Sequence, residues 1–231
     1  MAENWISFWN TQHSIYVNAR HLDLHYRDVA ERLLQLSPKP TDNVLDFGCG
    51  EATHADLVAA RVGQLWLCEA AERVRDHLRA RFGQTANMKV IGSDEHRNLA
   101  PGTFDLIVAN SVAQYLTRDE LDALLRAWRR LLKPDGRLII ADVVPPGVSP
   151  ISDALALLRY AWSNGFLVAA FAGLVRTTLS PYRRIRARLG ITTYTEPEIT
   201  ERISAAGFSV ERLPFNFEHQ PARISFVATP R

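Results

Sequence analysis

Cysteine is scarce in this sequence: Cys49 and Cys68 are the two among 231 residues, and they form no CxxC pair. This spacing argues against a disulfide framework and against a cysteine-based zinc site. The start of the chain, MAENWISFWNTQH, has neither the positively charged segment nor the apolar segment of a secretory signal. These absences together predict a protein of the reducing cytoplasm.

A long hydrophobic run and a large net charge are also missing. The apolar run FLVAAFAGLV, residues 166–175, has ten residues and is too short to span a bilayer. The net charge of +2 gives no indication of a nucleic-acid partner. The hydrophobic fraction of 47% and the charged fraction of 23% are those of a soluble globular protein. The length predicts one domain with appendages.

Acidic residues are absent between Asp153 and Glu196. The same stretch contains six arginines: Arg159, Arg176, Arg183, Arg184, Arg186 and Arg188. One interpretation is a helical lid that packs on the domain, or on a second copy in a homodimer, with solvated arginines. The other is an amphipathic surface over residues 154–190 that makes peripheral contact with an anionic membrane.

Strand and helix patterns alternate along the middle of the chain, which predicts a doubly wound, parallel sheet. Thr117 and Glu120 have the spacing of a helix capping box, and KPDG is typical of a turn. A helical pattern over 3–36 precedes this region, and apolar helices over 151–190 follow it. The expected strands are 43–49, 64–70, 88–93, 103–111, 136–144, 208–215 and 222–230, and the expected helices between them are 52–62, 71–82, 118–132 and 196–207.

The stretch VLDFGCGEAT follows the first expected strand and contains Gly48 and Gly50. Glycines at a strand end bring the backbone close to a ligand, but the third glycine of the dinucleotide fingerprint is replaced by Thr53. Asp46 and Glu51 flank the turn, and two carboxylates would repel a pyrophosphate. They would favour a cationic ligand such as S-adenosylmethionine, which has a sulfonium, an ammonium and no phosphate.

Glu69 ends the second expected strand, 19 residues after Gly50. Taken alone it is an ordinary acid at a strand end. Next to the glycine turn, its carboxylate can accept hydrogen bonds from both hydroxyls of a ribose. The combination favours a ligand that contains a ribose.

The ordered set of motifs resembles the class I S-adenosylmethionine-dependent methyltransferases of the small-molecule type. VLDFGCG resembles the first motif of that family, CEA the acidic second motif, and GSDEHRNLAPGTFDLIVANSVAQYL the segment leading into the fourth strand. The resemblance implies a seven-stranded Rossmann-like sheet, mostly parallel with an antiparallel last strand, plus N-terminal helices and a helical lid. It divides the single domain 1–231 into an N-terminal cap (1–40), a cofactor-binding core (41–145), a lid (146–195) and a final helix with two strands (196–231).

The resemblance also implies which residues hold the cofactor. The glycine turn would lie under the methionine part, Glu69 would bind the ribose, and either Ser93 or Asp94 would meet the adenine amine. We interpret Cys49 as a small residue under the turn and not as a nucleophile. The full expected set is Asp46, Gly48, Cys49, Gly50, Glu69, Ala70, Ser93, Asp94, Glu95, Asn110, Ser111 and Gln114.

Two subclasses of the family do not match. Relatives that methylate nucleobase amino groups have an Asn/Asp-Pro-Pro-aromatic run where this chain has NSVAQY. Catechol-type relatives bind magnesium with acids at the ends of the fourth and fifth strands. Here Asp142 is present but the fourth strand ends at Asn110, and one carboxylate with one amide is a poor divalent-cation site. We therefore predict no metal.

Residues for acceptor chemistry are less clearly marked. Methyl transfer needs alignment of the reacting atoms, and it needs a base only if the acceptor must lose a proton. We predict His219 and Tyr16 as catalytic residues, chosen from a set that also includes His13, Arg20, His21, His25 and Glu218. The predicted substrate-binding residues are Tyr115, Trp162, Phe166 and Phe171.

The sequence thus predicts methyl transfer from S-adenosylmethionine to a small, largely apolar or amphipathic acceptor at oxygen, nitrogen or carbon. Three alternatives stay open at this point. They are aminopropyl transfer on the same fold, a non-catalytic module that binds S-adenosylmethionine, and a membrane-associated lipid methyltransferase.

Overall fold

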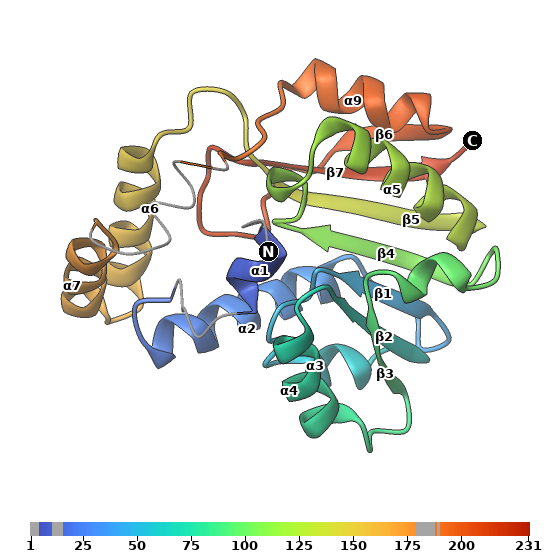
Figure 1. The fold of residues 1–231 in the computed structure, drawn as a ribbon, viewed down its shortest axis with the longest axis horizontal. Coiled ribbons are helices and arrows are strands. Elements are labelled where there is room, and N and C mark those ends of the chain that lie inside the picture. Colours follow the sequence, from blue (N-terminus) through green and yellow to red (C-terminus); the bar gives the residue numbers. More distant parts are fainter. Residues whose placement is uncertain (1–4, 11–15, 179–187, 189) are drawn as a thin grey trace.

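A computed structural model describes residues 5–10, 16–178, 188 and 190–231, and one seven-stranded sheet forms its centre (Figure 1). The strand order is β3-β2-β1-β4-β5-β7-β6. β7 runs antiparallel to both β5 and β6, whereas the other neighbouring strands are parallel. This arrangement confirms the predicted fold class. The strands are β1 Asn43–Phe47, β2 Gln64–Glu69, β3 Met88–Gly92, β4 Phe104–Asn110, β5 Leu132–Val143, β6 Phe208–Arg212 and β7 Ile224–Pro230.

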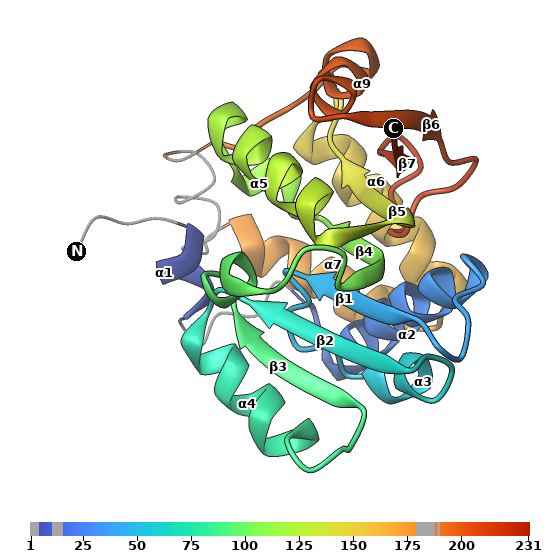
Figure 2. The same cartoon turned by 90° about the vertical axis from the view of Figure 1, so that its right-hand side faces the viewer.

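Helices cover both faces of the sheet, which explains why the central strands read as continuous apolar runs. One buried cluster joins the sheet to α5 and α9, and another joins it to α2, α3 and α4. Figure 2 shows these layers from the side. The helices are α1 Trp5–Trp9, α2 Ala19–Gln35, α3 Ala55–Ala59, α4 Glu72–Phe82, α5 Arg118–Leu131, α6 Pro150–Ser163, α7 Leu167–Thr178 and α9 Glu196–Ala205, with short 3-10 turns η1 Glu95–Asn98 and η2 Ala113–Tyr115.

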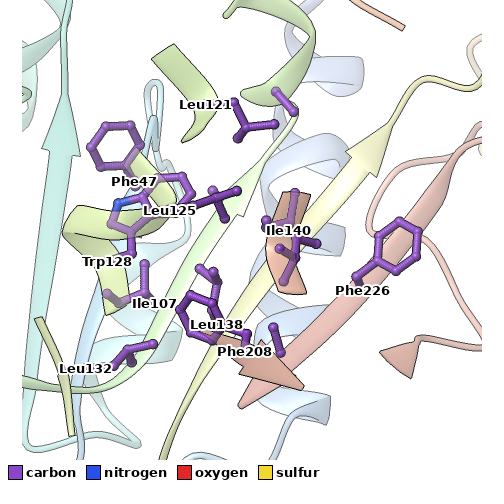
Figure 3. Close-up of a cluster of buried hydrophobic side chains, with 14 of the residues drawn as sticks. Phe47, Ile107, Leu121, Leu125, Trp128, Leu132, Leu138, Ile140, Phe208 and Phe226 are labelled. Atoms are coloured by element: carbon purple, nitrogen blue, oxygen red, sulfur yellow. The ribbon is translucent and has the colours of Figure 1, made fainter. Parts of the chain in front are cut away.

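Helix α5 shows how local sequence and core packing agree. Thr117 and Glu120 form the predicted capping box at its start. Leu121, Leu125 and Trp128 follow the helical period, are at most 1% exposed and point into the cluster on this face of the sheet (Figure 3). Removal of the Trp128 side chain would cost about 3–5 kcal/mol of folding stability, as for other buried aromatic residues.

The structure differs from the sequence prediction at three places. The expected helix 52–62 is shortened to α3, because Gly50 and the residues after it form turns. The expected N-terminal helix 3–36 is divided into α1 and α2. The expected KPDG turn is included in β5, where the register against β4 shifts between Phe104 and Leu106.

Helices α6 and α7 lie beyond the carboxyl ends of the parallel strands, at the same edge as α1 (Figures 1 and 2). Phe166 and Ala170 are buried there in a small cluster with Val17 and Leu24. Gly173 of α7 approaches Val17 so closely that a Cβ atom would clash with it. The lid therefore packs on the start of α2. In the described part of the chain, no helix has the length and apolar character needed to cross a membrane.

Candidate active site

Two glycines form a tight turn directly after β1. Gly48 (φ 74°) and Gly50 (φ 58°) both have left-handed backbone conformations, which glycine adopts without strain. The Gly48 amide donates to the carbonyl of Cys68 at 2.8 Å. A Cβ atom at position 48 would lie 2.5 Å from Val112 Cγ2, and one at position 50 would clash with the Tyr26 hydroxyl. The turn is enclosed on both sides, and it requires glycine at both positions.

Two carboxylates, those of Asp46 and Glu69, lie next to this turn. The Glu69 carboxylate accepts hydrogen bonds from the amides of Gly50 (3.0 Å) and Ala71 (2.8 Å). Burial raises the pKa of Glu69, and burial together with Glu69 raises the pKa of Asp46 to about 7. Among the described residues, neither carboxylate forms an ion pair. The turn is therefore an electronegative site that would favour a cation.

The other backbone positions expected around the turn are also close to it. Cys49 and Cys68 are free and buried, and burial raises the pKa of both thiols, so neither is activated as a nucleophile. The carbonyl of Ala70 accepts a hydrogen bond from Arg75 Nη1 at 2.6 Å. This bond fixes the end of β2 beside the Glu69 carboxylate.

The segment expected at the adenine follows β3. Glu95 Oε1 accepts a hydrogen bond from the Gly92 amide at 2.8 Å, so this carboxylate stabilises the turn. Asp94 is exposed and Ser93 is half-buried. His96, which the sequence did not single out, is 1% exposed, contacts the Ser93 carbonyl through Nδ1, and has a pKa lowered by burial.

The end of β4 supplies a group of polar side chains. Asn110 Nδ2 donates to Glu218 Oε1 at 2.8 Å, while Asn110 Oδ1 is buried without a hydrogen-bond partner among the described residues. Ser111 has a left-handed backbone (φ 56°), and its hydroxyl donates to Asp142 Oδ2 at 2.6 Å. Gln114 Nε2 donates to the Ser111 carbonyl at 3.2 Å. Asn110 is thus fixed in orientation, with one acceptor atom still available.

Helix α1 lies over this edge of the sheet. The Trp5 ring is 4.7 Å from the Tyr115 ring, and the Trp9 ring is 5.9 Å from it. At the end of α1, Asn10 Oδ1 accepts a hydrogen bond from the Arg73 amide of α4 at 3.1 Å. The aromatic residues at the chain start therefore connect the loop after β4 with the start of α4, and Tyr115 packs against them.

Helix α2 brings His25 to the loop between β6 and β7. His25 Nδ1 lies 3.0 Å from Glu218 Oε2. The Tyr16 ring lies 5.0 Å from the His25 ring, and burial raises the Tyr16 pKa well above its usual value. The Tyr26 hydroxyl accepts a hydrogen bond from the Glu51 amide at 2.8 Å, directly after the glycine turn. The predicted residue Tyr16 and the pair His25–Glu218 thus lie side by side.

A buried ion pair holds the same loop to β5. Arg223 Nη1 lies 2.5 Å from Asp142 Oδ2, and Arg223 Nη2 lies 3.4 Å from Asp153. Asn216 Nδ2 donates to Asp142 Oδ1 at 2.9 Å. Asp142 therefore has a cationic partner within the protein, and in the described part of the chain no cluster of three His, Cys, Asp or Glu residues could hold a metal ion.

The predicted catalytic residue His219 lies in an aromatic group. Its ring stacks on Tyr160 with centroids 4.9 Å apart, and burial lowers its pKa. His21 stacks on Phe166 at 5.3 Å, and burial with His219 nearby lowers the His21 pKa to about 4. Both imidazoles are therefore neutral at physiological pH. Phe166 belongs to this group.

A cavity of about 450 Å³ opens next to that group. Helices α2 and α6 and the β6–β7 loop form its walls. It is lined by Asp28, Glu31, Arg32, Gln35, Ala156, Arg159, Tyr160, Ser163, Phe217, Glu218, His219 and Pro221. None of the four predicted substrate-binding residues lines this cavity. Phe166 packs in the neighbouring cluster, Tyr115 packs against α1, and Trp162 (75% exposed) and Phe171 (65% exposed) lie on the outside of the lid.

Sequence reasoning missed Tyr26 and Arg223 and did not pair His25 with Glu218. The segment HLDLHY places histidines at 21 and 25, one helical turn apart, and this spacing could have indicated a shared helix face. Arg223 is 81 residues from Asp142, and no local pattern in the sequence connects the two.

Comparison with known proteins identifies methyltransferases as similar to this chain. Residues 44–136 match the family model described as Methyltransferase domain. Nocamycin O-methyltransferase from Saccharothrix syringae is 31% identical over 191 residues, which cover 79% of this chain. The match covers 65% of that relative, so the chain spans just under two thirds of its length.

Solved structures share the fold at low sequence identity. Magnesium protoporphyrin IX methyltransferase from Synechocystis, with bound SAH, has a TM-score of 0.59 at 17% identity, covering 97% of this chain and 92% of that one. The DhpI–SAH complex has a TM-score of 0.61 at 16% identity, covering 97% and 94% of the two chains.

Proposed function

We propose, from the methyltransferase-domain match over residues 44–136, that the chain is a class I S-adenosylmethionine-dependent methyltransferase that transfers a methyl group to a small acceptor. The acceptor is amphipathic or largely apolar, and the transfer is an in-line displacement without a metal. The observation that carries the proposal is the electronegative glycine turn beside the free acceptor atom of Asn110.

The residues at the turn fit S-adenosylmethionine as the cofactor. Its ammonium and sulfonium would supply the positive charge that Asp46 and Glu69 lack, and a donor for Asn110 Oδ1. Each Glu69 oxygen accepts one amide and has a second lone pair for a ribose hydroxyl. The cofactor supplies an activated methyl group on sulfur. The protein aligns the acceptor with that group and excludes water.

Calorimetry with S-adenosylmethionine, S-adenosylhomocysteine and NAD tests the cofactor assignment. We expect binding of the first two and no binding of NAD, because a pyrophosphate next to Asp46 and Glu69 would be repelled. Tight binding of NAD would contradict the proposal. Release of S-adenosylhomocysteine in the presence of small hydroxyl, amine and carbon acceptors would separate an enzyme from a non-catalytic binding module, and aminopropyl transfer would release no S-adenosylhomocysteine.

We assign the acceptor to the cavity between α2, α6 and the β6–β7 loop. His25, Asp28 and Arg32 share one face of α2, so the cavity begins one turn from His25. Tyr160 and Phe217 give it an aromatic wall, while Asp28 and Arg32 give it polar groups. This mixture suits an amphipathic acceptor. Filling the cavity with Ala156→Trp should raise KM for the acceptor and leave the S-adenosylmethionine affinity unchanged.

His219 and Tyr16 stay the catalytic residues predicted from the sequence. His219 borders the cavity, and Tyr16 lies between His21, His25 and Tyr26. Single variants His219→Ala and Tyr16→Phe should each lower kcat with little change in cofactor affinity. An unchanged kcat in either variant would remove that residue from the proposal.

A second function, contact with an anionic membrane, is favoured by the outer face of α6 and α7. Apolar side chains are exposed there: Ile151, Leu155, Trp162, Val168, Phe171 and Val175. Arg159 lies among them in a second cavity, and neither Arg159 nor Arg176 forms an ion pair with a described residue. Apolar groups with unneutralised arginines suit an anionic lipid surface. The arginines at 183, 184 and 186 lie outside the described residues.

Flotation with vesicles containing phosphatidylserine tests this contact. We expect binding that weakens with added salt and is lost in the variant Trp162→Ser/Phe171→Ser. A chain that stays unbound and forms a dimer in light scattering would instead assign the face to a second copy. A chain that stays unbound and monomeric would leave the face with neither role.

A further inference from the structure

Three parts of the molecule that are far apart in the sequence meet at Glu218. His25 of α2 lies 3.0 Å from one carboxylate oxygen, and Asn110 at the end of β4 donates to the other at 2.8 Å. Burial alone would raise the Glu218 pKa, but His25 and Asn110 hold it well below its usual range, at about 2. Glu218 is therefore a fixed anion that orients the His25 ring.

The orientation leaves one nitrogen of His25 for another partner. Nδ1 faces Glu218, and a hydrogen bond there places the lone pair of a neutral imidazole on Nε2. No described residue forms a hydrogen bond with Nε2. The His25 side chain is 16% exposed, so the ring is buried except for a small opening.

His25 also lies close to the methionine end of the proposed cofactor site. Tyr26, the next residue, receives the Glu51 amide and packs against Gly50. Asn110, the residue with the free acceptor atom, shares Glu218 with His25. The imidazole is thus connected to both sides of the site where the methyl group would be transferred.

We propose that His25 is the general base of the reaction, that Glu218 is its positioning residue, and that the acceptor is a hydroxyl compound. The inference rests on the proposed methyl transfer. The acceptor O–H proton moves to His25 Nε2, the oxygen electron pair forms the new O–CH₃ bond, and the S–CH₃ bond breaks with its electrons on sulfur. S-Adenosylhomocysteine leaves as a neutral thioether, and His25 later gives the proton to solvent.

A hydroxyl acceptor is the class that needs this arrangement. A phenol has a pKa near 10 and stays protonated at neutral pH, so a base increases its nucleophilicity. Burial would lower the His25 pKa, but Glu218 raises it above the usual value, which makes His25 a stronger base. The charged or titratable groups that face His25 are Glu218, Asp142, Asp28, His21, His219, Tyr16 and Tyr26.

Matched phenols and thiophenols test the inference, because a thiophenol ionises readily and needs no base. For His25→Gln we expect phenol methylation to fall roughly 100-fold or more, and thiophenol methylation to change less than about threefold. Calorimetry should show unchanged S-adenosylmethionine affinity, which distinguishes loss of the base from loss of the fold. His77→Gln, an exposed histidine on α4, is the matched control and should behave as the unmodified protein.

The variant Glu218→Gln sharpens the test. The rise of kcat/KM with pH should move to lower pH in this variant, because the anion that raises the His25 pKa is gone. Equal losses on phenols and thiophenols in His25→Gln would overturn the inference. So would turnover of amine or carbon acceptors without any hydroxyl acceptor, and in that case the proposed methyl transfer would still stand.

An NMR titration of labelled histidine needs no acceptor. The His25 pKa should lie above the usual histidine value in the unmodified protein and return toward it in Glu218→Gln. A His25 signal that titrates identically in both proteins would overturn the inference even if no acceptor were turned over. Absence of S-adenosylmethionine binding in calorimetry would overturn the proposed function itself.

Discussion

The two halves of the candidate active site treat negative charge in opposite ways. Around the glycine turn, Asp46 and Glu69 are close together, and neither forms an ion pair with a described residue. Around the β6–β7 loop, Glu218 is paired with His25, and Asp142 is paired with Arg223. The first half is suited to a cation from outside the protein, whereas the carboxylates of the second already have partners within the protein, which suits a neutral acceptor.

The largest effect should come from breaking the internal pair of the second half. Arg223→Met leaves Asp142, whose side chain is fully buried, without its cation and should lower the free energy of unfolding by about 3 kcal/mol. Urea denaturation measures this loss. Arg212→Met removes an exposed pair with Glu196 and should cost less than about 1 kcal/mol. Similar losses in the two variants would contradict the described contrast.

The next effect concerns Glu69 in the first half. Glu69→Ala should weaken S-adenosylmethionine binding by about 1–3 kcal/mol, the scale of a lost buried hydrogen bond. Glu72→Ala, in the exposed first turn of α4, is the control. Calorimetry measures both. An affinity that does not change in Glu69→Ala would remove this residue from the ribose.

Smaller effects are expected for Asp46, whose replacement should increase folding stability and decrease cofactor affinity. Its pKa is raised to about 7 by burial. Between about pH 4 and pH 7 the unfolded chain therefore ionises this group while the folded protein keeps it protonated, and folding stability falls as pH rises through this range. Asp46→Asn should therefore raise the free energy of unfolding at pH 8 by about 1–2 kcal/mol while weakening S-adenosylmethionine binding. In the unmodified protein the affinity should increase as pH rises through 7, and in the variant this increase should disappear.

Across this pH range, thermal unfolding measures the change in stability and calorimetry measures the change in S-adenosylmethionine affinity. Asp56→Asn, on the exposed side of α3, provides the control. If Asp46→Asn destabilised the protein at pH 8, Asp46 would have a stabilising partner, and the first half would not be the uncompensated one.

The smallest expected effect is that of metal removal. Asp142 is already bound by Arg223, Ser111 and Asn216, so activity should survive EDTA without measurable loss. Loss of activity on chelation, with recovery on addition of magnesium, would show that Asp142 has a role beyond its ion pair.

The sequence predicted the sheet and the glycine turn well because their signals are local. The apolar runs at β1 and β4 are buried on both faces, and Gly48 and Gly50 have the positive φ values that a turn toward a ligand requires. The capping box at Thr117 was predicted for the same reason, since its two partners are three residues apart. Local chemistry determines local structure in these cases.

The contacts of the second half could not be predicted in this way. His25 reaches Glu218, and Arg223 reaches Asp142, only because the order of strands brings β5 and β7 together under α2. The orientation of the lid side chains could not be predicted from the sequence either. Its helices follow from periodicity, but the outward position of Trp162 and the inward position of Phe166 depend on how α7 packs against Val17.

The close contact between Gly173 and Val17 has a consequence for the order of events in turnover. Arg20 Nε also donates to the Asn164 carbonyl at 2.7 Å, and Arg176 donates to the Val17 carbonyl at 3.2 Å. These contacts hold the lid against the start of α2, and we expect the two to move as one rigid body. Because Tyr16 and His25 belong to this body, a movement that admits the acceptor would also displace these side chains from beside the proposed cofactor site. We therefore expect ordered kinetics, in which S-adenosylmethionine binds first and S-adenosylhomocysteine leaves last.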